Sequence, residues 1–402
     1  MEETSGKGKN IIFYISMIGF FGIFTTTISK NPVLPYLVKS LGAGDQILGI
    51  ISAVSPLAGI IFSFPVGFLA DKTGKKIMLI TASFIFLLAP LMYLLVTNAW
   101  WLIPVRFFHG MATAILGPIA STIIAESYDS NRGEKLGVYS SATLTGRTLA
   151  PLAGGAIIAF FSMKGELASY RAVYSAAFLM SIPVVAGAFL VKTGDAGVKK
   201  SISLNEFFKS IRYIAGNKLI LATALVDLST YFSFGIFETF APGYLKNAGY
   251  KPEIVGLIFS LQILSIAVTK PLFGRLADSI DKRIQISSGL FILGLSVAAL
   301  PFVTSFAAVL AVSMIFGLAM SLSTVATSAY VADVAEKEHL GASMGALSSI
   351  MDVGHSSGPL IAGTVITLLS LKAGFFSGFI LALSVVVMFV FFAFMEKRKT
   401  IK

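Results

Sequence analysis

Apolar residues in this chain form long runs that short polar segments separate. A helix that spans a bilayer needs about 20 mostly apolar residues, and twelve runs reach that length. We expect membrane helices at about 11–38, 46–68, 77–97, 100–125, 136–161, 170–191, 218–245, 253–275, 284–303, 306–332, 340–369 and 373–395. The pattern therefore predicts an all-α membrane protein with twelve transmembrane helices.

One polar connection, at about 192–217, is much longer than the others. We interpret it as a cytoplasmic linker between an N-terminal six-helix bundle, 1–191, and a C-terminal six-helix bundle, 218–402. The first apolar run follows Lys7 and Lys9 and is longer than the apolar core of a signal peptide, so we expect it to be retained as a helix.

Lysine and arginine then set the orientation. With the N-terminus inside, the segments on that side hold 21 of these residues and the opposite segments hold six. Because positive charge concentrates on the cytoplasmic side of membrane proteins, we predict that both termini are cytoplasmic. We expect a multi-pass protein in the cytoplasmic (inner) membrane of a prokaryote.

Two polar motifs repeat across the chain. GFLADKTGKK at 67–76 aligns with GRLADSIDKR at 274–283 when the sequence is compared with itself at a shift of 207 residues. GRTLAPLAGG at 146–155 falls on GHSSGPLIAG at 354–363 with a shift of 208. An even number of helices in each copy keeps both copies in the same orientation. The sequence therefore predicts two parallel six-helix repeats, with a binding site expected where they meet.

Composition excludes several classes of protein. Hydrophobic residues make up 55% of the chain and charged residues 13%, against about 25% charged in soluble domains. The net charge of +11 is spread over short clusters, so we expect a lipid bilayer and not nucleic acid as the partner. The chain has no cysteine, and therefore no disulfide framework or thiolate metal site.

Known motifs of enzymes are also missing from the sequence. No metal-ligand spacing, phosphate-binding loop or nucleophile elbow occurs. A polytopic membrane enzyme, the alternative from a different class, is therefore disfavoured. Because no nucleotide-binding motif is found, we expect no cofactor and an ion gradient as the energy source.

The motifs carry a family resemblance that covers the whole chain. GFLADKTGKK resembles the loop 2–3 signature of the major facilitator superfamily. Arg106 and Gly110 in VRFFHGMATA resemble the helix 4 signature of its proton-coupled members. GRTLAPLAGG resembles the helix 5 signature of drug:proton antiporters, with Ala150 where a glycine is usual. Many drug exporters have an acidic residue in helix 1, whereas the only charge here is Lys30.

The resemblance implies the major facilitator fold and the transport of a small-molecule substrate by a monomer. The most similar group is the twelve-helix exporters that resemble drug:proton antiporters. In this family the carboxylate at the position of Asp71 contacts the N-terminus of helix 11 and holds the cytoplasmic side shut. The alternative is that the lysines beside it are ordinary membrane anchors.

Small and charged motif residues are candidates for gating. Glycine and proline let a helix bend or pack closely, so these positions suit a hinge, a seam between the two halves or simple packing. The gating candidates are Gly67, Asp71, Gly74, Lys75, Asp278, Gly146, Pro151, Gly155, Gly358 and Pro359.

Charges inside the membrane are a second set of candidates. A charge near the bilayer centre costs at least about 2.5–3.5 kcal/mol, so it is a functional candidate by default. For the substrate cavity the candidates are Lys30, Arg106, Asp227, Glu238 and Arg147. For proton coupling they are Asp227, Arg106, Asp352, His355 and Glu238.

Several roles compete for these groups. Asp352 and His355 are three residues apart on one helix face, which suits either a proton relay or a static polar pair. Lys30 and Glu238 lie one residue away from equivalent positions, which suits either an ion pair at an outer gate or a static pair. Asp227 has no acidic counterpart in the first half, so we favour it as the coupling acid.

The predicted function is secondary active transport by alternating access. The helix 5 signature favours proton-coupled export, by antiport, of a small amphipathic or drug-like solute. The basic interior of the first half leaves a second possibility open, a proton-coupled symporter or a facilitator of an organic anion.

Overall fold

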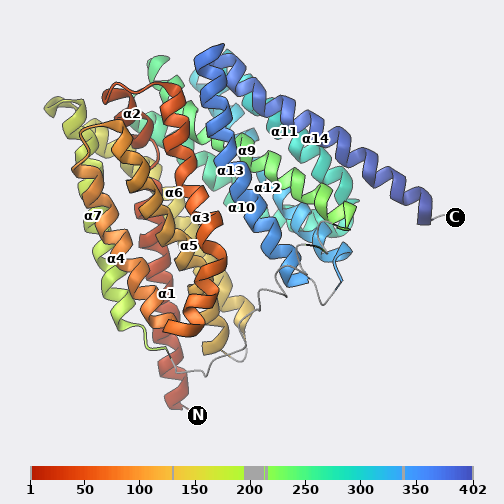
Figure 1. Cartoon of the computed structure of the whole chain (residues 1–402), viewed down its shortest axis with the longest axis horizontal. Helices are drawn as coiled ribbons and strands as arrows, with labels where there is room; N and C mark the ends of the chain where they lie inside the picture. The colour runs from red at the N-terminus through yellow and green to blue at the C-terminus, as the bar shows by residue number, and fades with distance from the viewer. Residues whose placement is uncertain (1, 129–130, 194–211, 213–215, 337–339, 401–402) are drawn as a thin grey trace. The chain divides into compact units, whose positions relative to one another are not determined.

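A computed structural model describes residues 2–128, 131–193, 212, 216–336 and 340–400, and Figure 1 labels its helices. The described residues contain no strand. The helices are α1 (Glu2–Ile28), α2 (Val33–Ser40), α3 (Asp45–Thr73), α4 (Lys75–Leu94), α5 (Leu102–Ser127), α6 (Arg132–Phe160), α7 (Glu166–Leu190), α9 (Lys218–Asn247), α10 (Pro252–Ser279), α11 (Lys282–Ala299), α12 (Phe306–Val334), α13 (Leu340–Leu368) and α14 (Leu371–Thr400). Three short 3₁₀ turns join them: η1 (Ala99–Trp101), η2 (Ser162–Lys164) and η3 (Leu300–Phe302).

The helices follow the predicted order. Twelve helices of 18 or more residues lie in the described part of the chain, at the twelve predicted positions. The first predicted span is the one that is interrupted, because α1 ends at Ile28 and α2 begins at Val33. The prediction of an all-α fold with twelve long helices is confirmed.

Ten helical segments of the described chain are long and apolar enough to cross a membrane. The two long helices outside this set are α6 and α13, which occupy equivalent places in the two repeats. Both carry many glycine, serine and threonine residues. Their lower hydropathy therefore reflects these small and hydroxylated residues together with Arg147 in α6 and Asp352 and His355 in α13.

Contacts divide the chain into two compact units. Unit 1 comprises 1–43, 54–201 and 245–260, and unit 2 comprises 44–53, 202–244 and 261–402. Each unit therefore takes one short segment from the opposite half of the sequence. The domain boundary predicted at 192–217 stays a prediction, since most of that linker lies outside the described residues.

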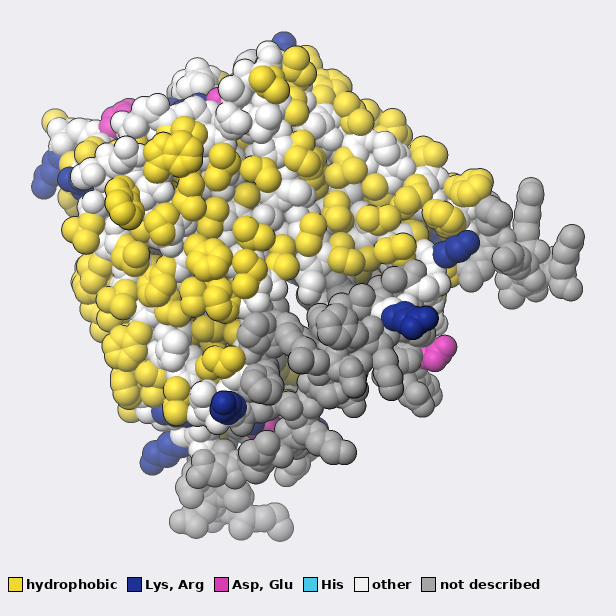
Figure 2. Space-filling view, in the orientation of Figure 1, with side chains coloured by type: hydrophobic (Ala, Val, Ile, Leu, Met, Phe, Trp, Pro, Cys, Tyr) yellow, Lys and Arg dark blue, Asp and Glu magenta, His cyan; other side chains and the backbone are white. Residues whose placement is uncertain are grey.

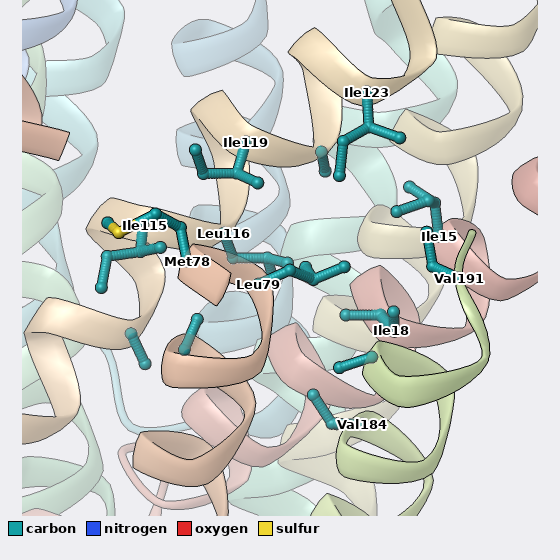
Figure 3. Close-up of a cluster of buried hydrophobic side chains, with 14 of the residues drawn as sticks. Ile15, Ile18, Met78, Leu79, Ile115, Leu116, Ile119, Ile123, Val184 and Val191 are labelled. Carbon is teal, nitrogen blue, oxygen red and sulfur yellow. The ribbon is translucent and has the colours of Figure 1, made fainter. Parts of the chain in front are cut away.

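Each unit has its own apolar core. In unit 1, side chains from α1, α4, α5 and α7 form one buried cluster, part of which Figure 3 shows. Leu79 of this cluster and Ile286 of the unit 2 cluster are both 0% exposed and lie at equivalent positions of the repeat. The two repeats therefore bury the same helix faces.

Large apolar side chains also cover the surface, as Figure 2 shows for one face. Val268 is 61% exposed and Ile380 62%, in the middle of long helices. Contiguous exposed apolar surface of this kind is a liability in water but suits lipid. Trp100 and Trp101 lie exposed between α4 and α5, where an interfacial aromatic belt is expected. The protein is therefore a multi-pass membrane protein.

Candidate functional site

The repeated polar motif builds the same ion pair in both units. Lys75 Nζ, at the start of α4, lies 2.6 Å from Glu126 Oε2, near the end of α5. Lys282 Nζ, at the start of α11, lies 2.8 Å from Asp333 Oδ2, near the end of α12. The shift of 207 residues that aligns the lysines also aligns the two acids. Each pair therefore ties the third helix of its repeat to the fourth.

The two pairs differ in exposure. The side chains of Lys75 and Glu126 are 17% and 18% exposed, whereas Asp333 is 58% exposed. Lys75 also donates to both carboxylate oxygens of Glu126, at 2.8 and 2.6 Å. Because water screens exposed charges, we expect the pair in unit 1 to be the stronger. Glu126 and Asp333 were not predicted as site residues.

The second cation of each motif donates to backbone carbonyls of another helix. Lys76 Nζ donates to the carbonyls of Ala188 and Phe189 in the last turn of α7, both at 2.6 Å, and to that of Val191. Arg283 Nη1 donates to the carbonyl of Ala393 in α14, at 3.3 Å. Carbonyls at a helix C-terminus lack partners within their helix and carry partial negative charge. In unit 1 this cation thus stabilises the C-terminus of the sixth helix.

Other motif residues are described only in part. Gly67 and Asp71 belong to α3, but the side chain of Asp71 and the surroundings of both residues lie outside the described part of the chain. The contact expected of Asp71 therefore stays a prediction. Gly74 links α3 to α4 with φ at +90°, a conformation that favours glycine. Asp278 is exposed.

The glycines of α6 and α13 allow close helix crossings. A Cβ at Gly146 would overlap the carbonyl oxygen of Phe20 in α1 and lie 3.2 Å from its carbonyl carbon. A Cβ at Gly354 would overlap the carbonyl oxygen of Leu228 in α9 and lie 2.9 Å from its carbonyl carbon. Gly358 lies equally close to the α9 backbone one turn later. The first two crossings are equivalent under the repeat.

The prolines of α6 and α13 lie at two further crossings. Within unit 1, a Cβ at Gly256 of α10 would lie 3.0 Å from the carbonyl carbon of Pro151, and Gly155 lies similarly close to the start of α10. Within unit 2, a Cβ at Gly49 of α3 would lie 3.1 Å from the carbonyl carbon of Pro359. These crossings join segments from opposite halves of the sequence. The close packing expected of these positions is therefore present, while a hinge role stays a prediction.

Asp227 lies deep in unit 2. Its residue surface is 1% exposed, and Thr327 of α12 donates its hydroxyl to Oδ1 at 2.8 Å. One turn away, the hydroxyls of Thr230 and Ser323 lie 3.5 Å apart between the same two helices. No cation among the described residues forms an ion pair with Asp227. The coupling acid favoured from the sequence is thus a buried carboxylate with a hydroxyl partner.

His355 pairs across helices, not along its own helix. Its Nε2 lies 2.9 Å from Glu238 Oε2, and the ring of Phe234 lies 5.3 Å from the imidazole. Partly buried Asp352 has no hydrogen bond or ion pair with a described residue, so the relay and the static pair weighed for Asp352 and His355 both stay predictions. The close crossing at Gly354 brings the backbone of α13 against α9, the helix that carries Glu238.

Lys30 and Arg147 are the two remaining candidate cations. Lys30 is half-buried in unit 1. Glu238 belongs to unit 2, so the predicted pair of Lys30 and Glu238 stays a prediction. Arg147, on α6, is exposed and forms no ion pair with a described residue.

Arg106 lies at the centre of a buried polar cluster in unit 1. It and His109 are each 1% exposed, and His109 Nε2 lies 3.2 Å from Thr26 Oγ1. The rings of Tyr93 and Tyr174 stack with centroids 4.5 Å apart. Electrostatic interactions link Arg106 with His109 and both tyrosines. No described carboxylate pairs with Arg106.

The described side chains contain no group of three or more His, Cys, Asp or Glu that could hold a metal ion. The chemistry of the two units therefore rests on separate buried groups: a carboxylate and a His–Glu pair in unit 2, and a guanidinium in unit 1.

Comparison with known families gives one match that spans nearly the whole chain. A model described as the Major Facilitator Superfamily matches residues 15–251 and 223–402. Among individual proteins, the chain is 25% identical to an uncharacterized MFS-type transporter of Methanocaldococcus jannaschii, over 91% of this chain and 94% of that protein. It is 24% identical to a homolog of the multi-drug resistance efflux pump PmrA from Lactococcus lactis, over 93% and 92%.

Solved structures show the same fold. A mutant of the nucleoside transporter NupG superposes with a TM-score of 0.81 at 12% identity, covering 94% of this chain and 99% of that one. A bacterial homolog of the human lysosomal transporter Spinster superposes with a TM-score of 0.73 at 15% identity, covering 96% and 95%.

Proposed function

The chain belongs to the Major Facilitator Superfamily, and we propose that it is a secondary active transporter that exports small amphipathic or drug-like solutes in exchange for protons. The family acts on small molecules by transport, not by chemical conversion. Export is supported by relatives that are named multidrug efflux pumps or resistance proteins over 93–95% of this chain.

The single observation that carries proton coupling is the environment of Asp227. A coupling acid must take up and release a proton as access alternates between the two sides of the membrane. Asp227 is buried, has a neutral hydroxyl from Thr327 as its partner, and has no cation paired with it among the described residues. No fixed ion pair therefore holds this carboxylate in its charged form.

An amphipathic cargo is consistent with the second buried pair of unit 2. Glu238 and His355 present polar groups among aromatic rings, with Phe234 at 5.3 Å and Tyr231 at 6.4 Å from the imidazole. Aromatic faces attract cations as well as apolar groups. This combination suits a solute with both a polar head and an apolar body.

The proposed orientation follows from the charge distribution along the sequence. Both termini lie in the cytoplasm, and the protein resides in the cytoplasmic membrane of a prokaryote as a monomer. A proton gradient drives transport without a cofactor.

Transport into inverted membrane vesicles tests the proposal. A panel of cationic dyes and organic anions is offered with and without an imposed pH gradient, and vesicles that lack the protein serve as the control. We expect cationic amphipathic dyes to accumulate only when the vesicle interior is acidic. Dye uptake that ignores the gradient would contradict proton-coupled export. Movement of organic anions together with protons would instead support the symporter alternative.

A further inference from the structure

Arg106 is a buried charge that forms no ion pair with any described residue. It is 1% exposed, and its Nε and Nη1 atoms have no hydrogen-bond partner among the described residues. A guanidinium cannot lose its proton at ordinary pH, so it cannot become neutral to avoid the cost of burial. Removing a charge from water is unfavourable unless an opposite charge and hydrogen bonds compensate it.

The carboxylates of unit 1 do not supply that compensation. Four have described side chains, and three of them, Glu126, Glu134 and Glu166, form ion pairs with lysines. The fourth, Glu253, forms no ion pair with Arg106. The positive charge of Arg106 is therefore not offset by the described acids of its own unit.

The fold itself does not require a charge at this place. The repeat position of Arg106 is Ser313 in unit 2, which is 0% exposed and donates to its own helix, to the carbonyl of Val309 at 2.8 Å. The repeat position of His109 is Phe316, also fully buried. Unit 2 thus builds the equivalent part of its helix without any ionisable group, and the buried cation is particular to unit 1.

The described polar groups around Arg106 carry no negative charge that would repel an anion. Thr26 donates its hydroxyl to the carbonyl of Gly22 at 3.1 Å, so at 3.2 Å it accepts from His109 Nε2. The stacked rings of Tyr93 and Tyr174 belong to the same cluster. Charge–charge attraction is much stronger in such a water-poor place than at the surface.

We propose that Arg106 is the centre of an anion-binding site in unit 1, which takes a small monovalent anion through its Nε and Nη1 groups. The shared chemistry is that of a chloride ion or of the carboxylate group of an organic solute. Hydrogen bonds from an arginine to an anion are among the stronger ones in proteins. The site goes beyond proton-coupled export, which depends on Asp227 in unit 2.

Thermal unfolding of the purified full-length protein tests this site. The sodium salt of a bulky sulfonate, an anion too large for a small site, is replaced stepwise by sodium chloride or sodium acetate at constant ionic strength. Because a ligand that binds only the folded state stabilises it, we expect the unfolding temperature to rise and then saturate. Arg106→Gln should lose this rise. Arg171→Gln, which removes an exposed arginine from α7 of the same unit, should keep it.

The two anions distinguish the sources. If the unfolding temperature saturates with chloride but not with acetate, the ligand is an inorganic ion. If it saturates at lower concentrations of acetate than of chloride, the ligand is a carboxylate group. An unfolding temperature that stays constant as each of the two anions replaces the sulfonate would overturn the proposal, as would a wild-type response in Arg106→Gln. If Arg106→Gln does not fold, equilibrium dialysis of the wild-type protein with radioactive chloride and with radioactive acetate decides. Saturable binding of either anion, close to one per chain, supports the site, and no binding of either one refutes it.

Discussion

Replacing Gly146 by alanine tests the close crossing of α1 and α6. The new Cβ would overlap the carbonyl oxygen of Phe20 and lie 3.2 Å from the carbonyl carbon, whereas ordinary contact begins at 3.4 Å. Both atoms belong to the backbone of a packed helix, so no side-chain rotation can relieve the overlap. Overpacking of this kind costs about 1–3 kcal/mol. Alanine gains about 1 kcal/mol of helix propensity over glycine.

The net result depends on which effect is larger. Because two backbone segments must separate, we expect the cost of overpacking to lie at the upper end of its range. After the gain in helix propensity is subtracted, Gly146→Ala should lower the free energy of unfolding by about 1–2 kcal/mol. Gly137→Ala is the matched control in the same helix, since a Cβ there meets nothing within 4 Å. It should keep the propensity gain and be as stable as the wild type, or up to about 1 kcal/mol more stable.

The assay is denaturant-induced unfolding of the purified variants in one detergent, with the transport rate measured in parallel. A difference of about 1.4 kcal/mol in the free energy of unfolding changes the ratio of folded to unfolded protein tenfold. Gly354→Ala should repeat the loss in unit 2, with Gly345→Ala as its control, since a Cβ at Gly345 also meets nothing within 4 Å. If Gly146→Ala is as stable as Gly137→Ala, the crossing does not need glycine and the packing argument fails.

Three further predictions concern the ion pairs, the topology and the His–Glu pair. Lys75→Ala should destabilise the protein by about 1 kcal/mol in the same unfolding assay. Lys282→Ala should destabilise it by less, because Asp333, the partner of Lys282, is mostly exposed. Equal losses of stability would contradict the role of burial. A reporter fused after Lys402 should be active in the cytoplasm and one inserted at Asn247 outside it, and the reverse result would overturn the orientation. His355→Asn should lower proton-driven transport several-fold while membrane insertion, measured by protein level in the membrane, stays normal; unchanged transport would show that the pair is static.

The helices could be predicted because a lipid environment requires long apolar segments, which are easy to recognise in a sequence. Every spanning segment must be long and largely apolar, so twelve runs in the sequence became twelve long helices. The break in the first run, at 29–32, is less visible. Pro32 and Pro35 indicate a distortion there, but residues on both sides are apolar and the run continues through them.

The partners of the charged residues were harder to predict. The repeat alone could have identified Glu126 as the partner of Lys75, because the same shift aligns the equivalent lysine and acid in the second half. The partner of His355 could not be found in this way. Helix periodicity places His355 on one face with Asp352, but the contact with Glu238 depends on how closely α13 approaches α9. That distance is set by tertiary packing, which spacing along one helix does not encode.

Transport by Asp227→Asn in proteoliposomes tests proton-coupled export most directly. The substitution keeps the size of the side chain and removes its ability to carry a proton. We expect the variant to lose all accumulation driven by a pH gradient, yet to exchange labelled for unlabelled solute at the wild-type rate when the pH is equal on both sides. Accumulation of solute against its gradient by Asp227→Asn, driven by the pH difference, would contradict the account.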